Sequence, residues 1–352
     1  LRLTMTNSLY SHWQQPKDGW LQVDTLDMHT GGEPLRIIID GFAELQGQTM
    51  IEKRADCLTR FDHLRKALMF EPRGHADMYG ALITKPERKD SHFGVLFLHN
   101  EGYSTMCGHA IIALATAAKD SSICNFIEGV NELRIDTPAG LIKAYITLRD
   151  NQLISVCFDN VASYAEKLDM PIEIPLFGAV NCDIAYGGAY YAFVDADTLD
   201  VSLAPNNHEQ IISLGKIIKQ HVNSHYQPKH PTDDALSFLY GVIFYSNSQK
   251  SHSAFSRHVC IFAEGELDRS PTGTGVSARA ALEFAKGRLK LGQQIRIESI
   301  LGSVFSVELK SQRMLADTHA VIPRVSGEAF VTGKHTFLID PNDPLKQGFI
   351  FR

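Results

Sequence analysis

The sequence lacks long apolar runs and clusters of like charge. No stretch of its 352 residues approaches the roughly 18 uninterrupted apolar residues that a membrane-spanning helix needs. Lysine and arginine are dispersed, and the formal net charge of −6 argues against nucleic acid or an anionic membrane as the main partner. The composition is otherwise that of a globular protein, with enough length for two domains.

Cysteine is scarce and scattered, since the six cysteines include no CxxC pair. A chain of this length needs no disulfides to fold, and the first 22 residues lack the apolar core of a secretion signal. We therefore expect reduced thiols and a cytoplasmic location. No metal site is expected, because Cys107 and His109 stand two residues apart and no second pair has zinc-ligand spacing.

The stretch Ser104–Lys119, STMCGHAIIALATAAK, places a cysteine and a glycine at the beginning of an expected helix. A thiol at a helix N-terminus lies at the positive end of the helix dipole, so we expect a lowered pKa for Cys107. The N–H groups of Gly108 and His109 lack intrahelical partners and can hold a carboxylate or a phosphate. The loop therefore predicts a base or nucleophile beside an anion site, although a buried inert cysteine explains this stretch equally well.

A second glycine-containing turn opens another alanine-rich helix at Asp268–Gly287, DRSPTGTGVSARAALEFAKG. Its residues Thr272–Thr274 stand where Cys107–His109 stand in the first unit. A hairpin is expected after each helix. Its turn glycine is Gly140 in the first unit, 33 residues after Cys107, and Gly302 in the second, 30 residues after Thr272. Two such units predict a duplicated architecture whose helix N-termini face a shared cleft.

The segment Gly273–Ala278 also fits the G-x-G-x-x-A pattern of a dinucleotide-binding turn. That turn must follow a strand immediately, whereas here the preceding strand is expected to end near Ala263 and Pro271 lies in the loop. We therefore expect no nicotinamide or flavin cofactor.

Several motifs resemble those of the proline racemase family, and the likeness runs from about Val23 to the C-terminus. It implies a mixed α/β fold of the diaminopimelate-epimerase type. This fold has two pseudo-symmetric domains, each with β-structure wrapped around a central helix, and the active site lies between them. The motifs are DMHTGGEP (Asp27–Pro34), EPRGHADMYGAL (Glu71–Leu82), MCGHA (Met106–Ala110), TPAG (Thr137–Gly140), DRSPTGTG (Asp268–Gly275), ESILGSVF (Glu298–Phe305) and TGKHTFLIDPNDP (Thr332–Pro344).

On this basis we expect an N-terminal half over residues 1–168, which residues 340–352 rejoin, and a C-terminal half over residues 169–339. The resemblance further implies proton chemistry on proline or hydroxyproline without a metal or cofactor, and a homodimer.

The chain departs from the racemase pattern at Thr272, where racemases and 4-hydroxyproline epimerases have a second cysteine. A threonine hydroxyl is far too weak an acid to supply an alkoxide near neutral pH, whereas a thiolate is accessible. The substitution resembles the branch of the family that dehydrates trans-3-hydroxy-L-proline. One base suffices there: Cys107 removes the α-proton, the 3-hydroxyl leaves as water, and the enamine tautomerises to Δ1-pyrroline-2-carboxylate.

The resemblance also implies the contacts with the substrate. Backbone N–H groups of both helix N-termini hold the carboxylate, an aspartate pairs with the ring ammonium, and two aromatic rings pack against the substrate ring, although ordinary core packing explains the aromatics equally well. The expected catalytic residues are Cys107 and Thr272, and the expected substrate-binding residues are Gly108, His109, Asp268, Gly273, Thr274, Tyr79 and Phe262.

Two alternatives remain open at this point. The chain could be a hydroxyproline 2-epimerase or proline racemase in which Thr272 or a water molecule serves as the second acid. It could also be a non-catalytic imino-acid-binding protein that keeps only the carboxylate site.

Overall fold

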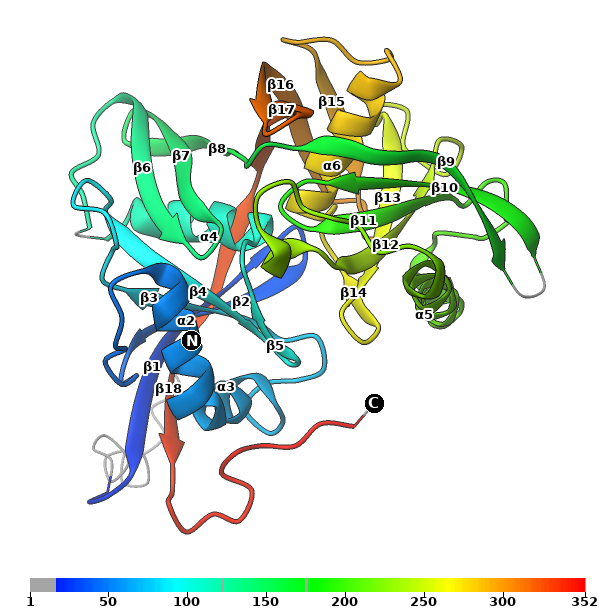
Figure 1. Ribbon diagram of the computed structural model, residues 1–352. Coiled ribbons are helices and arrows are strands. Elements are labelled where there is room, and N and C mark those ends of the chain that lie inside the picture. The colour runs from blue at the N-terminus through cyan, green and yellow to red at the C-terminus, as the bar shows by residue number, and fades with distance from the viewer. Residues whose placement is uncertain (1–16, 122, 175–176, 352) are drawn as a thin grey trace, which may run out of the picture.

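The computed structural model describes residues 17–121, 123–174 and 177–351, and β-strands dominate both lobes (Figure 1). The first part of the chain forms β1 Leu21–Thr30, β2 Glu33–Asp40, α2 Met50–Arg60, α3 Asp62–Met69, β3 Tyr79–Thr84, β4 Phe93–His99, β5 Gly102–Ser104, α4 Gly108–Ala118, β6 Gly129–Thr137, β7 Gly140–Arg149 and β8 Gln152–Asp159. The second part forms β9 Tyr164–Ile174, β10 Gly178–Tyr186, β11 Tyr190–Asp195, α5 His208–His225, β12 Leu239–Ser246, β13 Ser256–Phe262, β14 Glu266–Asp268, α6 Gly273–Ala285, β15 Gln294–Glu298, β16 Val304–Leu315, β17 Thr318–Gly327 and β18 Ala329–Ile339. Two short 3-10 helices cover Pro205–Asn207 and Asp234–Leu236.

The pairing of strands repeats in the same order in the two lobes. Strands β2 and β3 pair in parallel, as do β11 and β12 at the corresponding place. Strands β4 and β6 pair in parallel around α4, as do β13 and β15 around α6. The hairpins β6–β7 and β15–β16 then follow the two helices. The duplication expected from the two glycine turns is therefore present, and it extends upstream of them to most of the strands.

Each lobe is built around one buried helix. Helix α4 contacts β1, β2, β7 and β8 on several sides, and almost all of its residues are buried, so it is apolar around its whole circumference. Helix α6 contacts β9, β10, β11 and β16 and is buried in the same way. A helix that is apolar all round needs to be enclosed, and here strands enclose it. The expected fold, with β-structure wrapped around a central helix in each half, is confirmed.

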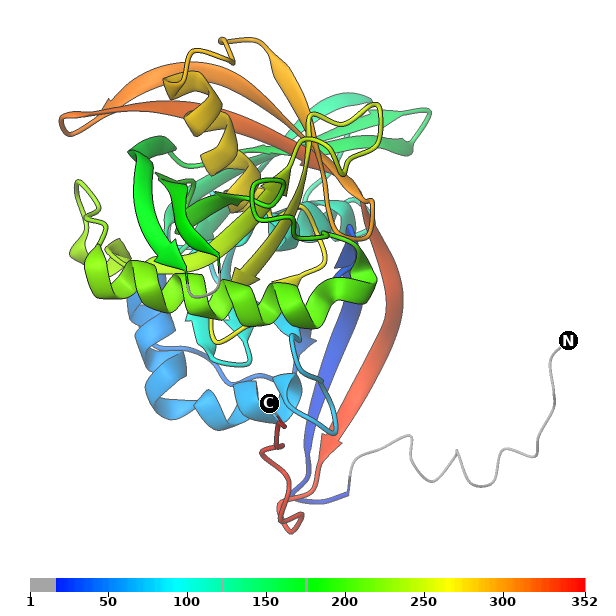
Figure 2. The same cartoon turned by 90° about the vertical axis from the view of Figure 1, so that its right-hand side faces the viewer.

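The two lobes exchange strands. Strands β8 and β17 pair with each other and join the lobes, and β9, which follows β8, pairs with β10 of the second lobe. Strand β18, which follows β17, returns to pair with β1 along its length, as the adjacent red and blue strands in Figure 2 show. The division at residues 168 and 339 stays a prediction. Because β18 pairs with β1, we propose that the C-terminal segment that rejoins the N-terminal half begins at Ala329.

No helix in the described ranges is long and apolar enough to cross a membrane. The long helix α5 instead lies across the second lobe, where it packs on β9, β12 and β13 (Figure 2).

The N-termini of α4 and α6 meet head to head. A Cβ atom built on Gly108 would lie 2.7 Å from the Cα of Gly273, and one built on Gly273 would lie 2.7 Å from the Cα of Gly108. Real Cβ atoms do not approach other atoms this closely, so only glycine fits at either position. The glycines that follow Cys107 and Thr272 therefore let the two helix ends come into backbone contact.

This contact predicts that Gly108→Ala separates the helix ends and lowers the free energy of unfolding by about 1–3 kcal/mol, as overpacking of a core does. A matched control is Gly333→Ala in β18, where the added Cβ meets only the side chain of His335, at 3.2 Å. Thermal or urea unfolding of the two variants checks the prediction. Equal stability of both variants would contradict the tight glycine contact.

Candidate active site

A small cavity lies where the two helix N-termini meet. Its volume of about 30 Å3 leaves room for about one or two water molecules. The structure brings all nine residues expected from the sequence to this one cavity, together with five that the sequence analysis missed. The lining residues are Glu33, Tyr79, Met106, Cys107, Gly108, His109, Tyr191, Tyr240, Cys260, Phe262, Asp268, Thr272, Gly273 and Thr274.

Cys107 is the N-cap residue of α4, with extended backbone angles of φ −146° and ψ 111°. Its side chain is buried, and its Sγ accepts a hydrogen bond from the N–H of Ala110 in the first helical turn. The Sγ atom also lies 3.2 Å from Nδ1 of His109. The local fold thus aims the thiol at the cavity and supplies it with one fixed backbone donor.

The pKa of Cys107 is raised, not lowered as the sequence suggested. Burial is the largest cause, and the carboxyl groups of Asp268 and Glu33 add to it, whereas the hydrogen bonds from Ala110 and Tyr79 act in the opposite direction. A sequence shows the helix N-terminus, but it does not show that the thiol is enclosed or that two carboxyl groups face it. In the ligand-free structure Cys107 is therefore a thiol at neutral pH.

His109 and Tyr79 support the thiol from two sides. Burial lowers the pKa of His109 to about 3, so its imidazole is neutral, and its ring donates a hydrogen bond to the carbonyl of Pro34. The ring of Tyr79 meets that of His109 edge-on at 4.9 Å, and its hydroxyl hydrogen-bonds with the hydroxyl of Ser104 and with Cys107. Neither group carries charge at neutral pH, because burial raises the pKa of Tyr79 well above its usual value.

Thr272 occupies the position opposite Cys107 and has an unusual backbone. Its φ of +66° lies in the left-handed region, which a β-branched residue seldom adopts. Its Oγ1 donates a 2.7 Å hydrogen bond to Oδ2 of Asp268, and Oδ1 of that carboxyl accepts one from the N–H of Ser270 at 2.8 Å. Backbone strain of the kind shown by the φ angle of Thr272 persists where the surrounding structure imposes it, and it is frequent at functional sites.

Three aromatic rings form one wall of the cavity. Phe262 stacks on Tyr240 at 5.5 Å, and Tyr240 meets Tyr191 edge-on at 5.9 Å. The hydroxyl of Tyr191 is 2.7 Å from Oγ1 of Thr274, which fixes the first turn of α6 to this wall. A small apolar ring can pack against this wall.

The five missed residues differ in the signal that the sequence carries for them. Glu33 and Met106 belong to motifs that carry the family resemblance, so the sequence marked both motifs. It did not show that these two residues line the cavity. Cys260 was one of six scattered cysteines, and Tyr191 and Tyr240 lie in strands that look like ordinary core. Only the packing of β11, β12 and β13 against the helix ends brings these last three to the cavity.

The charge balance of the cavity is one-sided. Among the described residues that line it, two carry carboxyl groups, Glu33 and Asp268, and none is a lysine or an arginine. Among these lining residues, the electropositive features are the N–H groups at the start of α4 and α6. This arrangement suits a small zwitterion, with its cation at the carboxyl groups and its carboxylate at the helix ends.

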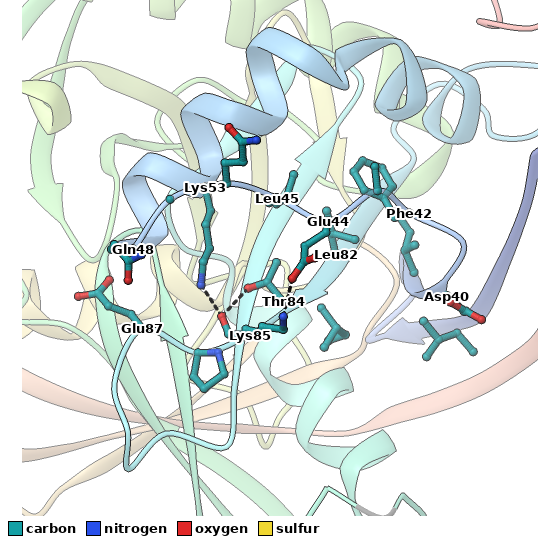
Figure 3. Close-up of a pocket in the computed structure, with 17 residues that line it drawn as sticks. Asp40, Phe42, Glu44, Leu45, Gln48, Lys53, Leu82, Thr84, Lys85 and Glu87 are labelled. Carbon is teal, nitrogen blue, oxygen red and sulfur yellow. Dashed lines mark hydrogen bonds and ion pairs between the residues drawn. The ribbon is translucent and has the colours of Figure 1, made fainter.

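A larger pocket of about 590 Å3 opens elsewhere on the first lobe, between the β2–α2 loop, α2 and the end of β3 (Figure 3). Its two lysines are occupied: Lys53 Nζ donates to the carbonyl of Lys85 at 2.6 Å, and Lys85 forms an ion pair with Glu44. No cysteine or histidine lies among the described residues that line this pocket. Size alone therefore does not identify the chemical site, and the small cavity is the better candidate.

Two similar lobes, each wrapped on a central helix and opposed across a shared cavity, define a protein of the diaminopimelate-epimerase-like class. Within this class, the sequence pattern that describes proline racemase matches residues 25–350 of the chain. The chain belongs to the proline racemase family.

Relatives cover nearly the whole chain. A protein of Colwellia psychrerythraea named trans-3-hydroxy-L-proline dehydratase is 50% identical over 346 residues, which are 97% of each chain. A Homo sapiens protein with the same name is 40% identical over 335 residues, or 94% of this chain and 95% of the relative. The crystal structure of a hydroxyproline epimerase from Agrobacterium vitis, with bound trans-4-OH-L-proline, has a TM-score of 0.87 and 30% identity. The structural match covers 95% of this chain and 96% of the epimerase chain.

The raised pKa of Cys107 predicts that the ligand-free protein contains no thiolate at this position until the pH rises above the ordinary thiol range of about 8.5. The ultraviolet absorbance of thiolate, measured in wild type and in Cys107→Ser, checks this. The difference between the two titrations should stay flat from acidic to neutral pH. A step near neutrality would show instead that the helix dipole outweighs burial.

Proposed function

We propose that this protein dehydrates trans-3-hydroxy-L-proline to Δ1-pyrroline-2-carboxylate. The observation that carries the proposal is the asymmetry of the two helix N-termini, where Cys107 faces Thr272 and not a second cysteine. A base on one side only suits elimination better than inversion, which needs acid/base groups on both faces of the α-carbon. The names of relatives at 40–50% identity support the same reaction.

We propose that the helix N-termini hold the substrate carboxylate. The small cavity is lined by the first residues of α4 and α6, which are Gly108, His109, Gly273 and Thr274, and their N–H groups lack intrahelical partners. A preorganised donor in such a site is worth roughly 3 kcal/mol toward developing negative charge, against about 0.3–1 kcal/mol for a helix dipole in an exposed setting. These donors therefore also stabilise the charge that spreads from the α-carbon into the carboxylate.

The ring ammonium binds at Asp268 in this scheme. Burial raises the pKa of Asp268, although hydrogen bonds from Ser270 and Thr272 partly oppose this effect. A bound ammonium favours the carboxylate form of Asp268 and, because it lies near Sγ, also the thiolate form of Cys107. The base therefore forms when the substrate arrives, while the empty site keeps a neutral thiol.

The reaction then proceeds on the Cys107 side of the ring. The thiolate takes the α-proton, the electrons of the Cα–H bond form a Cα–Cβ double bond, and the C3–O bond breaks. The resulting enamine moves a proton from nitrogen to C3 and becomes the imine. The rings of Phe262 and Tyr79 hold the substrate ring, and Thr272 positions Asp268 through its 2.7 Å hydrogen bond.

A second candidate function is 2-epimerisation of a hydroxyproline or proline, and one observation favours it. Cys260 of β13 lines the same cavity, and its thiol hydrogen-bonds with Thr272. The cavity therefore contains a second thiol, although position 272, where racemases have their second cysteine, is a threonine. Burial raises the pKa of Cys260 well above its usual value, and the carboxyl of Asp268 adds to this. Cys260 could serve only as an acid in such a reaction.

The remaining expectations stay predictions: a cytoplasmic homodimer that needs neither metal nor cofactor. The scheme above supports the absence of a metal or cofactor, because in it the thiolate of Cys107 removes the α-proton.

The first functional prediction concerns Cys107. Wild type should form imine from trans-3-hydroxy-L-proline, and Cys107→Ala should lower the rate roughly 10²–10⁴-fold because the α-proton loses its base. Cys124→Ala is the matched control, since this cysteine is only partly buried and lies outside the cavity. Imine formation that survives Cys107→Ala would exclude this thiol as the base.

The second prediction separates elimination from epimerisation. In D2O, L-proline or trans-4-hydroxy-L-proline should gain deuterium at the α-carbon with retained configuration, because only Cys107 exchanges the proton. Chiral chromatography and mass spectrometry measure both quantities. Inversion at the α-carbon that disappears in Cys260→Ala would instead establish the second candidate function.

A further inference from the structure

One buried carboxyl group in the cavity has no role in the scheme so far. Glu33 is the first residue of β2 and is fully buried. Its Oε2 accepts a 2.7 Å hydrogen bond from the N–H of Arg269, whereas its Oε1 is buried without a hydrogen-bond partner among the described residues. An unpaired buried polar atom is energetically costly, so such an atom in a cavity calls for a ligand or a reaction.

The fold holds Glu33 in place from both lobes. It follows the turn Gly31–Gly32, whose φ values of +60° and +98° match a tight hairpin turn that favours glycine. Ser303 of the second lobe donates a 2.8 Å hydrogen bond to the carbonyl of Gly31. On the other side of the turn, Thr30 donates one of 2.8 Å to the carbonyl of His109. The motifs DMHTGGEP and ESILGSVF therefore meet to fix this carboxyl.

The surroundings of Glu33 favour its protonated form. Burial raises its pKa well above the usual value, and the carboxyl of Asp268 raises it further, while Arg269 acts in the opposite direction. The guanidinium of Arg269 is shared, because it lies 3.0 Å from Asp77 and 3.9 Å from Oε2 of Glu33. A carboxylic acid with one oxygen bound to a backbone N–H and the other in the cavity can donate its proton to a ligand.

The stereochemistry of the substrate determines the face of the ring from which the acid must act. In trans-3-hydroxy-L-proline the hydroxyl and the carboxylate lie on opposite faces of the ring, so the hydroxyl shares a face with the α-hydrogen. The base and the acid must therefore act from the same side. Glu33 and Cys107 both come from the first lobe and line the same cavity, and Glu33 is close enough to raise the pKa of that thiol.

Three other side chains of the cavity, His109, Tyr79 and Thr272, are occupied or too weak to serve as the acid. The ring of His109 is neutral, donates to the carbonyl of Pro34 and lies 3.2 Å from Sγ of Cys107 through Nδ1. Burial raises the pKa of Tyr79 well above its usual value. Thr272 donates its only hydroxyl proton to Asp268 and belongs to the opposite lobe.

We propose that Glu33 is the general acid that protonates the departing 3-hydroxyl group, a role that rests on the proposed dehydration. As the Cα–H electrons form the double bond and the C3–O bond breaks, the proton of Glu33 joins the hydroxyl and water leaves. The step ends with a thiol at Cys107 and a carboxylate at Glu33. Uptake of one proton from solvent, which replaces the proton that Cys107 lost when the substrate bound, returns Glu33 to its acid form and leaves Cys107 as a thiol.

The test compares two leaving groups in Glu33→Gln, which keeps an acceptor for the N–H of Arg269 but has no acidic proton. Imine formation from trans-3-hydroxy-L-proline should fall roughly 10²–10⁴-fold. Elimination from trans-3-chloro-L-proline should stay within about threefold of wild type, because chloride leaves without a proton. Glu33→Asp, which retains the acid on a shorter chain, should recover part of the hydroxy activity and show the same chloro activity.

Asp268→Asn is the matched control, since it should impair both substrates alike by weakening the ammonium site. Equal losses with both leaving groups in Glu33→Gln would overturn the proposal and make Glu33 a structural residue. Full hydroxy turnover in that variant would overturn it as well. Wild type that forms no imine from the hydroxy substrate would overturn the proposed function itself, a result that the two Glu33 variants do not influence.

Discussion

The backbone contact between Gly108 and Gly273 is the constraint on which the rest of the site depends. It brings the positive ends of two buried helices to one small cavity that no lysine or arginine lines among the described residues. Two glycines make this possible because any Cβ at either position would collide with the other helix. The proposed carboxylate site is thus made of backbone N–H groups, which leaves the side chains around it for proton transfer.

Burial sets the chemical state of these side chains. It raises the pKa of Cys107, Glu33 and Asp268 and lowers that of His109, so it favours the neutral form of all four groups. In the proposed scheme a zwitterionic substrate changes this balance, because its ammonium would lie beside Asp268 and Cys107 while its carboxylate would lie at the helix ends. The charge that activates the thiol would then arrive with the substrate.

The sequence predicted the parts of this site that lie in short, distinctive motifs. Six of the nine expected residues lie in the two helix-opening turns, where glycine, cysteine and threonine precede a helix. The other three, Asp268, Tyr79 and Phe262, were expected from the resemblance to the proline racemase family. Cys260, Tyr191 and Tyr240 were missed because strand residues look alike whether they face a core or a cavity. The lowered pKa expected for Cys107 was wrong because a sequence shows a dipole but not the burial that outweighs it.

A crystal structure of Cys107→Ser with trans-3-hydroxy-L-proline tests the central claim most directly. The account predicts that the carboxylate lies between the N–H groups of the two helix ends and that the ring nitrogen contacts Asp268. The α-hydrogen and the 3-hydroxyl should both face the side of residue 107 and Glu33. A substrate whose α-hydrogen faces Thr272, or whose carboxylate lies away from Gly108 and Gly273, would contradict a one-sided elimination at this cavity.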